Sequence, residues 1–341
     1  MNTKNTQLVA RAAQDCNSFE HLVGGGGGSR AILAISGMMY AMDLGGIDLD
    51  KLESIGGISG GAMPTLMLAQ GMKPAQIVCT AVDVDFADNL VKHGNTFQLF
   101  YALLMKERYE RTKPIPAIFS TEKVAEYFDS RVPTWPEKFW CMAVHKENQI
   151  LFTARGVFQC SYDGTVTMIS NKPALVSDAI RGSMAVPGII RPRYWKGRFL
   201  FDGVLSWDGL CPVGVVLRNF GADPHKVIAC DVRDQNKGKV WAFLKKTWER
   251  LLVGLPWSEE ERSPRRFVAD GITLVEPELN KFGSLKFKLT EEEKWEAVIS
   301  SFCGTLKMLH KQGKVSDAKL AELEALAADS ARFIDSCREA D

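Results

Sequence analysis

The stretch Gly57-Ile58-Ser59-Gly60-Gly61 decides the fold, and a run of five glycines, Gly24–Gly28, precedes it in the chain. The stretch has the pattern G-x-S-x-G, which is typical of a sharp strand-to-helix turn that presents a serine hydroxyl as a nucleophile. Residues 51–57 predict the strand before the turn, and residues 60–70 predict the helix after it. Together with the strand and helix around the glycine run, this order predicts an α/β fold with a parallel sheet.

The glycine run lies between a predicted strand at residues 20–23 and a predicted buried helix at residues 30–42. A flexible linker fits poorly, because apolar segments adjoin the run on both sides. A dinucleotide-binding fingerprint fails because Ser29 occupies the third glycine position counted from Gly24 and Gly26, and a P-loop lacks its Gly-Lys-Ser/Thr. The remaining interpretation is a cluster of backbone N–H groups at a helix start, where an oxyanion can be held.

The rest of the chain continues the alternation of strands and helices. Strands are predicted at residues 139–144, 150–153, 165–169, 198–201, 226–231 and 271–276, and helices at 176–184, 291–310 and 316–338. The amphipathic segment 85–109 is interpreted as a lid, an acyl-pocket wall or a pair of cap helices. We expect a flexible tail at 1–18, one catalytic domain at 19–312 and a C-terminal helix at 313–341.

The composition excludes several classes of protein. The 341 residues are 46% hydrophobic and 24% charged, and 42 Lys and Arg against 41 Asp and Glu give no support for nucleic-acid binding. The eight cysteines are scattered without a C-x-x-C pair, which argues against a zinc site and favours reduced intracellular thiols. No secretory signal and no apolar run of membrane-spanning length is visible, so we expect a cytoplasmic or peripheral membrane protein.

The proton acceptor for Ser59 is less evident. None of the five histidines (His21, His93, His145, His225 and His310) has the setting expected of a general base. Asp202 directly follows the apolar strand at 198–201 and precedes Gly203, so we expect its carboxylate at the carboxyl edge of the sheet, where active sites of α/β proteins lie. An ordinary Asp-Gly turn is the alternative interpretation.

Together these segments resemble the patatin-like phospholipases. Gly26-Gly27-Gly28-Ser29-Arg30 is similar to the family's oxyanion loop, with Ala31 in place of its final glycine. Gly57–Gly61 matches the serine turn, and Asp202-Gly203-Val204 matches the later aspartate motif, with valine where a small residue is usual. Arg181–Pro187 is similar to the block before that aspartate. The resemblance covers residues 20–310.

The resemblance implies a three-layer α/β/α fold with a central, mostly parallel sheet and a helical C-terminal extension. It implies a Ser59–Asp202 dyad that works without histidine and needs no metal or other cofactor. The same resemblance implies that the oxyanion or the substrate contacts Gly26, Gly27, Gly28, Arg30 and Gly60. The family cleaves fatty-acyl esters of phospholipids and neutral lipids, so a phospholipase A type hydrolase with a membrane phospholipid as partner is expected.

Other interpretations stay open. An α/β-hydrolase-type carboxylesterase would use a Ser–His pair, a lipid transacylase would pass the acyl group to an alcohol, and a lipid-binding protein would have a silent site. The segment 240–257 combines tryptophans with lysines and is interpreted either as an interfacial membrane anchor or as a helix packed on the core. Some members of the resembled family are effectors secreted without a cleavable signal, so delivery into another cell is a further possibility.

Overall fold

The computed structural model describes residues 19–86, 88–92, 94, 117–232, 257–258, 260–279, 286 and 288–340. The predicted tail at 1–18, most of the amphipathic segment 85–109, and the segment 240–257 apart from Trp257 lie outside the described residues. Within the described part of the chain, no helix combines the length and the apolar composition that crossing a membrane requires.

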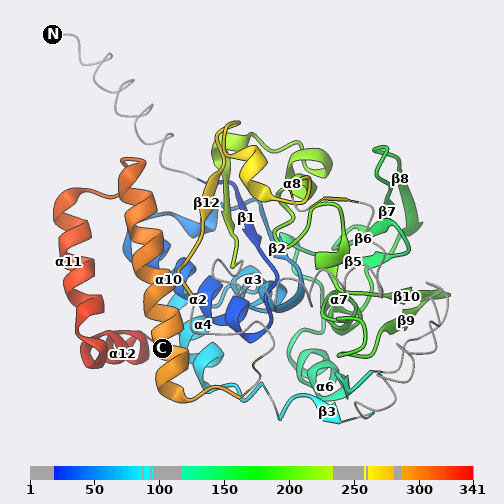
Figure 1. The fold of residues 1–341 in the computed structure, drawn as a ribbon, viewed down its shortest axis with the longest axis horizontal. Helices are drawn as coiled ribbons and strands as arrows, with labels where there is room; N and C mark the ends of the chain where they lie inside the picture. The colour runs from blue at the N-terminus through cyan, green and yellow to red at the C-terminus, as the bar shows by residue number, and fades with distance from the viewer. Residues whose placement is uncertain are drawn as a thin grey trace, which may run out of the picture.

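A single eight-stranded sheet forms the centre of the molecule (Figure 1). Its strands are β1 (His21–Gly24), β2 (Ser54–Gly57), β5 (Phe139–His145), β6 (Asn148–Thr153), β7 (Gly156–Cys160), β8 (Val166–Ser170), β11 (Val227–Cys230) and β12 (Thr273–Val275). Their order across the sheet is β12-β11-β1-β2-β5-β6-β7-β8. The first five run parallel and the last three pair antiparallel, so the predicted mostly parallel sheet is confirmed.

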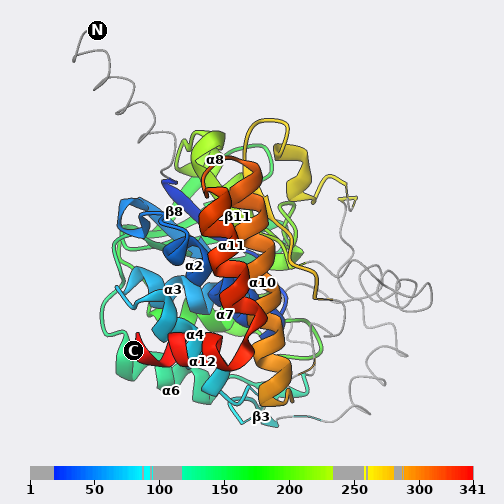
Figure 2. The same cartoon turned by 90° about the vertical axis from the view of Figure 1, so that its left-hand side faces the viewer.

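Helices cover both faces of this sheet, which makes three layers. The helices are α2 (Ser29–Leu44), α3 (Ala62–Ala69), α4 (Pro74–Asp83), α6 (Glu122–Arg131), α7 (Val176–Ser183), α8 (Val213–Asn219), α10 (Glu291–Lys311), α11 (Asp317–Ala328) and α12 (Ser330–Glu339). The alternation along β5 shows the two faces: Phe139 and Cys141 contact the layer of α3, α6 and α7, whereas Trp140 and Met142 contact that of α8. Figure 2 shows α10 and α11 in front of α2 and α4, on the face of the sheet opposite to α8.

The C-terminal region is two helices where the sequence predicts one at 316–338. Asp329 interrupts it with extended backbone at φ −98° and ψ 91°, and its side chain accepts a hydrogen bond from the N–H of Arg332, which starts α12. The break turns Phe333 and Cys337 into the core beside Tyr40 of α2. The predicted helical extension is therefore part of the main hydrophobic core.

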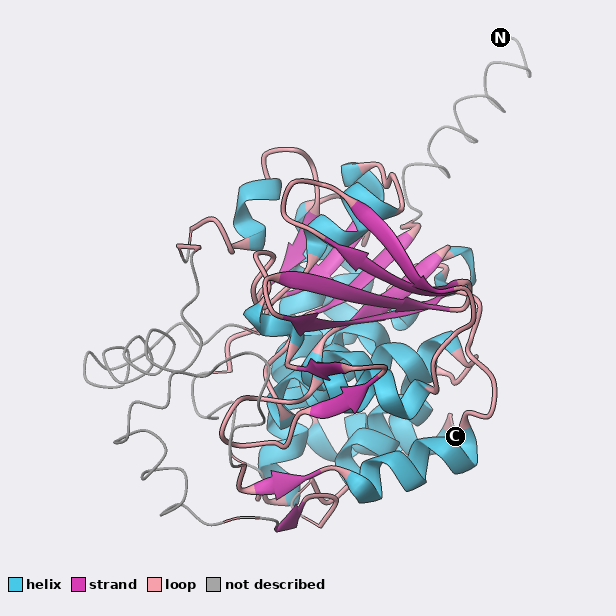
Figure 3. Cartoon of the chain, turned by 90° about the vertical axis from the view of Figure 1, so that its right-hand side faces the viewer, coloured by secondary structure: helices cyan, strands magenta, loops and turns pink. Residues whose placement is uncertain are grey.

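The antiparallel end of the sheet contains a strand that the sequence analysis did not predict. β7 has only five residues, and its hydrogen-bonding partners are β6 on one side and β8 on the other. Figure 3, which views the molecule from the right-hand side of Figure 1, shows the strands of this end of the sheet facing the viewer. Pairing with two neighbours rather than local propensity stabilises such a short strand, which is why pattern alone misses it.

Backbone contacts between the two glycine segments hold the centre of the sheet together. A Cβ atom at Gly57 would lie 2.3 Å from the carbonyl oxygen of Gly24, and one at Gly60 would lie 2.1 Å from that of Gly28. The same construction at Gly61 meets the Gly25 carbonyl oxygen at 2.2 Å. Glycine is therefore required by close approach of two backbones, and the run includes Gly24 as the last residue of β1.

Replacing Gly57 by alanine is expected to destabilise the protein by about 2 kcal/mol or more, because the new methyl group overlaps a carbonyl oxygen in a packed core. Gly304 is the matched control, since it lies inside α10 and a Cβ there meets only Pro277 at 3.8 Å. Gly304→Ala should stabilise the helix by about 0.5–1 kcal/mol. Urea unfolding of the three proteins measures both values, and equal effects of the two variants would contradict the close-approach argument.

Candidate functional site

Ser59 is positioned by the turn that connects β2 to α3. The strand ends at Gly57, and residues 59–61 form a single 3₁₀ turn before α3 begins at Ala62. Ser59 has φ 51°, in the left-handed region that a residue with a side chain seldom adopts. Such strain is stored where the surrounding structure holds it, and here it presents the serine hydroxyl beside the glycine loop.

Asp202 accepts a hydrogen bond from this hydroxyl. The Ser59 Oγ atom donates to the Asp202 Oδ2 atom at 2.8 Å, and the other carboxyl oxygen, Oδ1, accepts from the N–H of Val204 at 3.0 Å. Asp202 is fully buried and Ser59 is 5% exposed. The structure therefore brings together the two residues that the sequence analysis selected, and both carboxyl oxygens of Asp202 have a donor.

The strand that precedes Asp202 belongs to a different sheet from the one predicted. The strand before it, β10 (Arg198–Leu200), pairs with β9 (Arg193–Trp195) in a separate two-stranded sheet, so it is not a strand of the central sheet as expected. One antiparallel bridge between Phe201 and Val144 fastens the hairpin to β5. Asp202 thus reaches Ser59 from a hairpin laid on the edge of the sheet, a placement that local pattern does not encode.

Burial governs the charge of Asp202. Loss of hydration raises the pKa of its carboxyl to about 7, against 3.8 in an unburied state, and the hydrogen bonds from Val204 and Ser59 lower it by less. A carboxylate with a pKa near neutrality can exchange a proton with a hydroxyl and is a better base than an ordinary aspartate. The pair is therefore suited to activating the Ser59 hydroxyl.

The glycine loop supplies fewer free donors than predicted. The Gly25 N–H donates to the carbonyl of Cys230 at 3.0 Å, and the Gly26 N–H donates to that of Leu210 at 2.6 Å. Within the described part of the chain, the N–H groups of Gly27 and Gly28 donate to no other protein group. Gly28 has φ 62° and comes directly before α2, so these two N–H groups lie at a helix start.

Position 26 has no space for a side chain, which explains its glycine. A Cβ atom there would lie 3.3 Å from the Cβ of Ser59 and 2.5 Å from a methyl carbon of Val204. Gly26 therefore lies directly against the nucleophile turn while its own N–H is occupied. The expected donor role of Gly26 is corrected on this ground, because one N–H bonded to a carbonyl inside the protein is not available to an oxyanion.

Arg30 is buried rather than open to a ligand. It is 2% exposed, and its Nη2 atom donates to the carbonyl oxygen of Val232, which follows β11. The Val232 side chain in turn limits the space at Gly27, where a Cβ would lie 2.7 Å from a methyl carbon of it. Arg30 thus braces the wall of the glycine loop, which is a structural contribution that the sequence motif alone does not reveal.

A short segment at the end of α7, to which the sequence analysis assigned no role, holds both Ser59 and Asp202. The Ser59 N–H donates to the Ser183 Oγ atom at 2.9 Å, and the Ser183 hydroxyl donates to the carbonyl oxygen of Met142 at 2.6 Å. Two residues later, the carbonyl oxygen of Ala185 accepts from the Asp202 N–H at 3.0 Å. Ser183 is fully buried, and the motif containing it was noted without a role.

Arg262 supports the turn that follows Asp202. Its guanidinium donates to the carbonyl oxygens of Val204 and Ser206, the latter at 3.2 Å from Nε. Since the Val204 N–H holds the Asp202 carboxyl, Arg262 acts on that carboxyl through the backbone of the turn. No sequence signal marks this residue, because it lies far along the chain and outside any motif.

The described histidines are engaged elsewhere. His21 bonds through Nδ1 to the Ser54 hydroxyl at 2.8 Å, His145 to the Phe199 carbonyl, and His310 to Asp317 at 2.6 Å, while the His225 ring packs over Gly271. His93 lies outside the described residues. Among the described histidines, therefore, none is hydrogen-bonded to the Ser59 hydroxyl.

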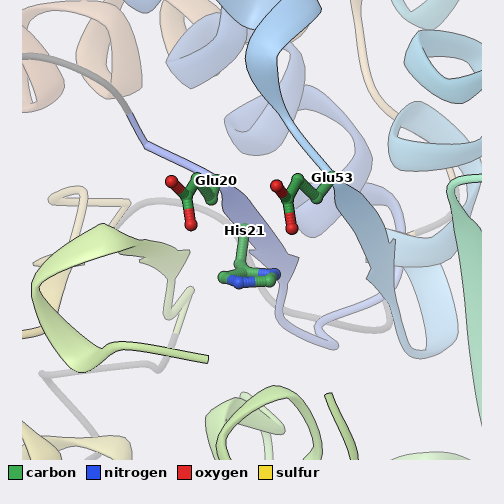
Figure 4. A group of neighbouring side chains, drawn as sticks. All are labelled: Glu20, His21 and Glu53. Atoms are coloured by element: carbon green, nitrogen blue, oxygen red, sulfur yellow. The ribbon is translucent and has the colours of Figure 1, made fainter. Parts of the chain in front are cut away.

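One group of side chains has the spacing of metal ligands. The ligand atoms of Glu20, His21 and Glu53 lie within 4.8 Å of one another, and Figure 4 shows them at the starts of β1 and β2. His21 already bonds Ser54, and Glu20 is ion-paired with Lys226. The group lies at the amino ends of strands whose carboxyl ends carry the candidate site, so it takes no part in the chemistry there.

Two comparisons with known proteins found similar proteins. The family model described as patatin-like phospholipase matches residues 22–217, which is more than half of the chain. Among solved structures, the crystal structure of VipD from Legionella pneumophila is similar with a TM-score of 0.47 and 14% sequence identity, over 86% of this chain and 67% of that one.

The buried carboxyl makes a testable contribution to stability. Between about pH 4 and pH 7 the folded protein keeps the Asp202 proton that the unfolded chain has lost, so the free energy of unfolding falls as the pH rises through this window. Asp202→Asn removes the ionisation. When the pH is raised from about 5 to about 8, the free energy of unfolding of the variant should increase by on the order of 2–4 kcal/mol relative to that of wild type. Urea unfolding at both pH values measures this difference, and parallel curves would contradict it.

Proposed function

The chain belongs to the patatin-like phospholipase family, and we propose that it hydrolyses fatty-acyl esters of phospholipids with Ser59 as nucleophile and Asp202 as its base. The family supports lipid acyl hydrolysis in general. The observation that carries the finer proposal is the 2.8 Å hydrogen bond from the Ser59 hydroxyl to the buried Asp202 carboxyl. A nucleophile bonded directly to a base is the arrangement that covalent acyl transfer requires.

The proposed reaction has two steps. Asp202 takes the proton of the Ser59 hydroxyl as the oxygen attacks the ester carbonyl carbon, and the ester bond breaks with return of that proton to the leaving lysophospholipid oxygen. Water then attacks the acyl-enzyme, passing a proton to Asp202, and the bond between the acyl carbon and Ser59 breaks. The fatty acid leaves, and Ser59 recovers its proton from Asp202. A carboxyl with a pKa raised to about 7 supports both directions of transfer.

The negative oxygen of each tetrahedral intermediate needs fixed donors. We assign this role to the N–H groups of Gly27 and Gly28, with the positive end of α2 behind them. Gly60, directly after the nucleophile, packs on the Gly28 backbone and completes the wall of the site. In other serine hydrolases, loss of one such donor costs about 3 kcal/mol of barrier, so two donors are enough to matter.

The other readings are less well supported. A Ser–His carboxylesterase needs a histidine beside Ser59. His21, His145 and His310 bond other groups, and the His225 ring packs over Gly271. A transacylase would use the same acyl-enzyme with an alcohol in place of water, so it is a variant of the same site. A silent lipid-binding site would not explain why a left-handed Ser59 is bonded to a buried carboxyl.

Access to a lipid substrate calls for contact with a membrane surface. We keep the segment 240–257 as the proposed peripheral contact, although only Trp257 of it is described. The Trp257 ring lies 5.7 Å from that of Trp207 and 5.9 Å from that of Tyr162, which is 64% exposed. Trp207 is buried and Trp257 is half-buried, so Tyr162 is the ring of this group that could meet the interface of a membrane. A cytoplasmic enzyme and an effector delivered into another cell would both use it.

The dyad is tested by fatty-acid release from mixed phospholipid vesicles. Ser59→Ala and Asp202→Asn are each expected to lower the rate by about 10³-fold or more, because each removes an obligatory partner of the nucleophile. His225→Gln and His310→Gln should leave the rate near that of wild type. Loss of turnover in either histidine variant, with turnover kept in Asp202→Asn, would overturn the dyad, and product analysis with added lysophospholipid separates hydrolysis from transacylation.

Ser183 is expected to act by holding Ser59 in place. Ser183→Ala leaves the Ser59 N–H and the Met142 carbonyl without their buried partner, so kcat should fall about tenfold while KM changes little. Ser177→Ala is the control, because Ser177 is buried on the same helix at 2% exposure. Unchanged kcat in folded Ser183→Ala, or an equal loss in the control, would show that the contact has no role in positioning.

A further inference from the structure

The loop between β10 and α8, residues 201–212, contributes to both halves of the candidate site. Near its start lies Asp202, whose carboxyl is bonded to the nucleophile hydroxyl and to the Val204 N–H. Near its end, the carbonyl oxygen of Leu210 accepts a hydrogen bond from the Gly26 N–H at 2.6 Å. A displacement of this one loop would therefore move the base and the glycine loop together.

This loop contains little regular structure that could hold it in place. Its regular part is a single 3₁₀ turn, Gly203–Leu205, and residues 205–209 are buried. Buried backbone carbonyls need hydrogen-bond donors, and a loop cannot supply them as a helix or a sheet does. The conformation of the loop therefore depends on donors from other parts of the chain.

Arg262 supplies such donors at the end of the 3₁₀ turn. Its guanidinium donates to the carbonyl oxygens of Val204 and Ser206, where its charge also faces the partial negative end of the turn. The backbone of Arg262 contacts the same loop. Gly209 has φ 65°, and a Cβ atom there would lie 2.4 Å from the Arg262 carbonyl oxygen. Arg262 thus contacts the loop through its side chain and through its backbone.

Arg266 provides a second attachment from the same segment, residues 260–267. Its Nη2 atom donates to the Asp208 Oδ1 atom at 3.3 Å. The other oxygen of this buried carboxylate accepts from Gln149 of β6 at 2.7 Å and from Arg218 of α8. Hydrogen bonds between charged groups are stronger than neutral ones, so Asp208 fixes the middle of the loop to three elements.

We propose that Arg262 is a positioning residue for the reaction: through the loop at 201–212 it holds Asp202 against the nucleophile, with Arg266 as a second attachment. This inference rests on the proposed function. Both arginines lie beyond residues 22–217, which the family model matches. The site is therefore completed by a segment that the nucleophile, glycine and aspartate motifs do not include.

The pH dependence of turnover tests this role. Arg262→Met keeps the aliphatic stem but removes the donors, so kcat for fatty-acid release from phospholipid vesicles should fall about tenfold while KM changes little. Burial raises the pKa of Asp202, and the hydrogen bond from Val204 lowers it. A looser turn weakens that bond, so the acidic limb of the profile of kcat/KM should move up by about 0.5–1 pH unit.

Two further variants separate positioning from a general effect of charge or stability. Arg262→Lys restores a positive donor that can reach one carbonyl, so it should recover part of kcat and return the acidic limb toward that of wild type. Arg265→Gln is the matched control, because Arg265 lies in the same segment but is exposed and paired with Glu276. A limb that stays in place in folded Arg262→Met, or moves equally in Arg265→Gln, would overturn the proposal.

A second measurement does not require activity. The titration of the Asp202 carboxyl is followed by ¹³C NMR on the full chain, with Asp202→Asn to assign the signal. Its midpoint should lie higher in Arg262→Met than in wild type by the same 0.5–1 pH unit or so. If Ser59→Ala releases fatty acid as fast as wild type, the proposed function fails, and an unchanged midpoint in Arg262→Met separately refutes the positioning.

Arg266→Gln carries the same titration if Arg262→Met does not fold. The change leaves Asp208 its bonds to Gln149 and Arg218, so the loop keeps most of its attachments. The midpoint of the Asp202 titration should then rise in the same direction by a smaller amount. A midpoint equal to that of wild type in Arg266→Gln would overturn the proposal.

Discussion

The contact of two glycine backbones is the constraint on which the rest of this structure depends. β1 and β2 lie side by side, and the segments that leave them approach so closely that a methyl group at Gly57, Gly60 or Gly61 would meet a carbonyl oxygen at 2.1 to 2.3 Å. Because no side chain separates the two backbones, the start of α2 and the turn at Ser59 share one small volume. This contact places the N–H groups at the start of α2 next to the hydroxyl of Ser59, whose backbone is strained.

The second constraint is the burial of a carboxyl group next to that hydroxyl. Asp202 is held from three directions: its side chain by Ser59 and Val204, and its own N–H by Ala185. Burial opposes its ionisation, and the hydrogen bonds only partly offset this, so the pKa of Asp202 stays near neutrality. The free energy of unfolding falls as the pH rises from about 4 to about 7, and the buried carboxyl that causes this loss is also a proton acceptor of suitable strength.

Much of the fold could be predicted because the signals were local. The glycines of Gly57–Gly61 predict a sharp turn, because only flanking glycines permit its strained backbone. The strands and helices around the turn are predicted by the apolar pattern. The pairing of Ser59 with Asp202 was also named in advance, and their contact is now seen, while their action as a catalytic pair stays a prediction. The failures were nonlocal: β7 depends on its neighbours, and Asp329 ends a helix whose amphipathic pattern continues through it.

The sequence by itself determined the nucleophile turn, the glycine loop and the aspartate motif. Each of these consists of neighbouring residues, so it can be recognised without the fold. Only the tertiary structure decided which donors are free. Gly26 and Gly27 look alike in the chain, yet the Gly26 N–H donates to the Leu210 carbonyl, whereas the Gly27 N–H has no acceptor among the described residues. The sequence motif predicts Arg30 as an anion ligand, but in the structure Arg30 is buried and donates to the Val232 carbonyl oxygen. Hydrogen-bond partners distant in sequence made these choices, and a local pattern contains no information about them.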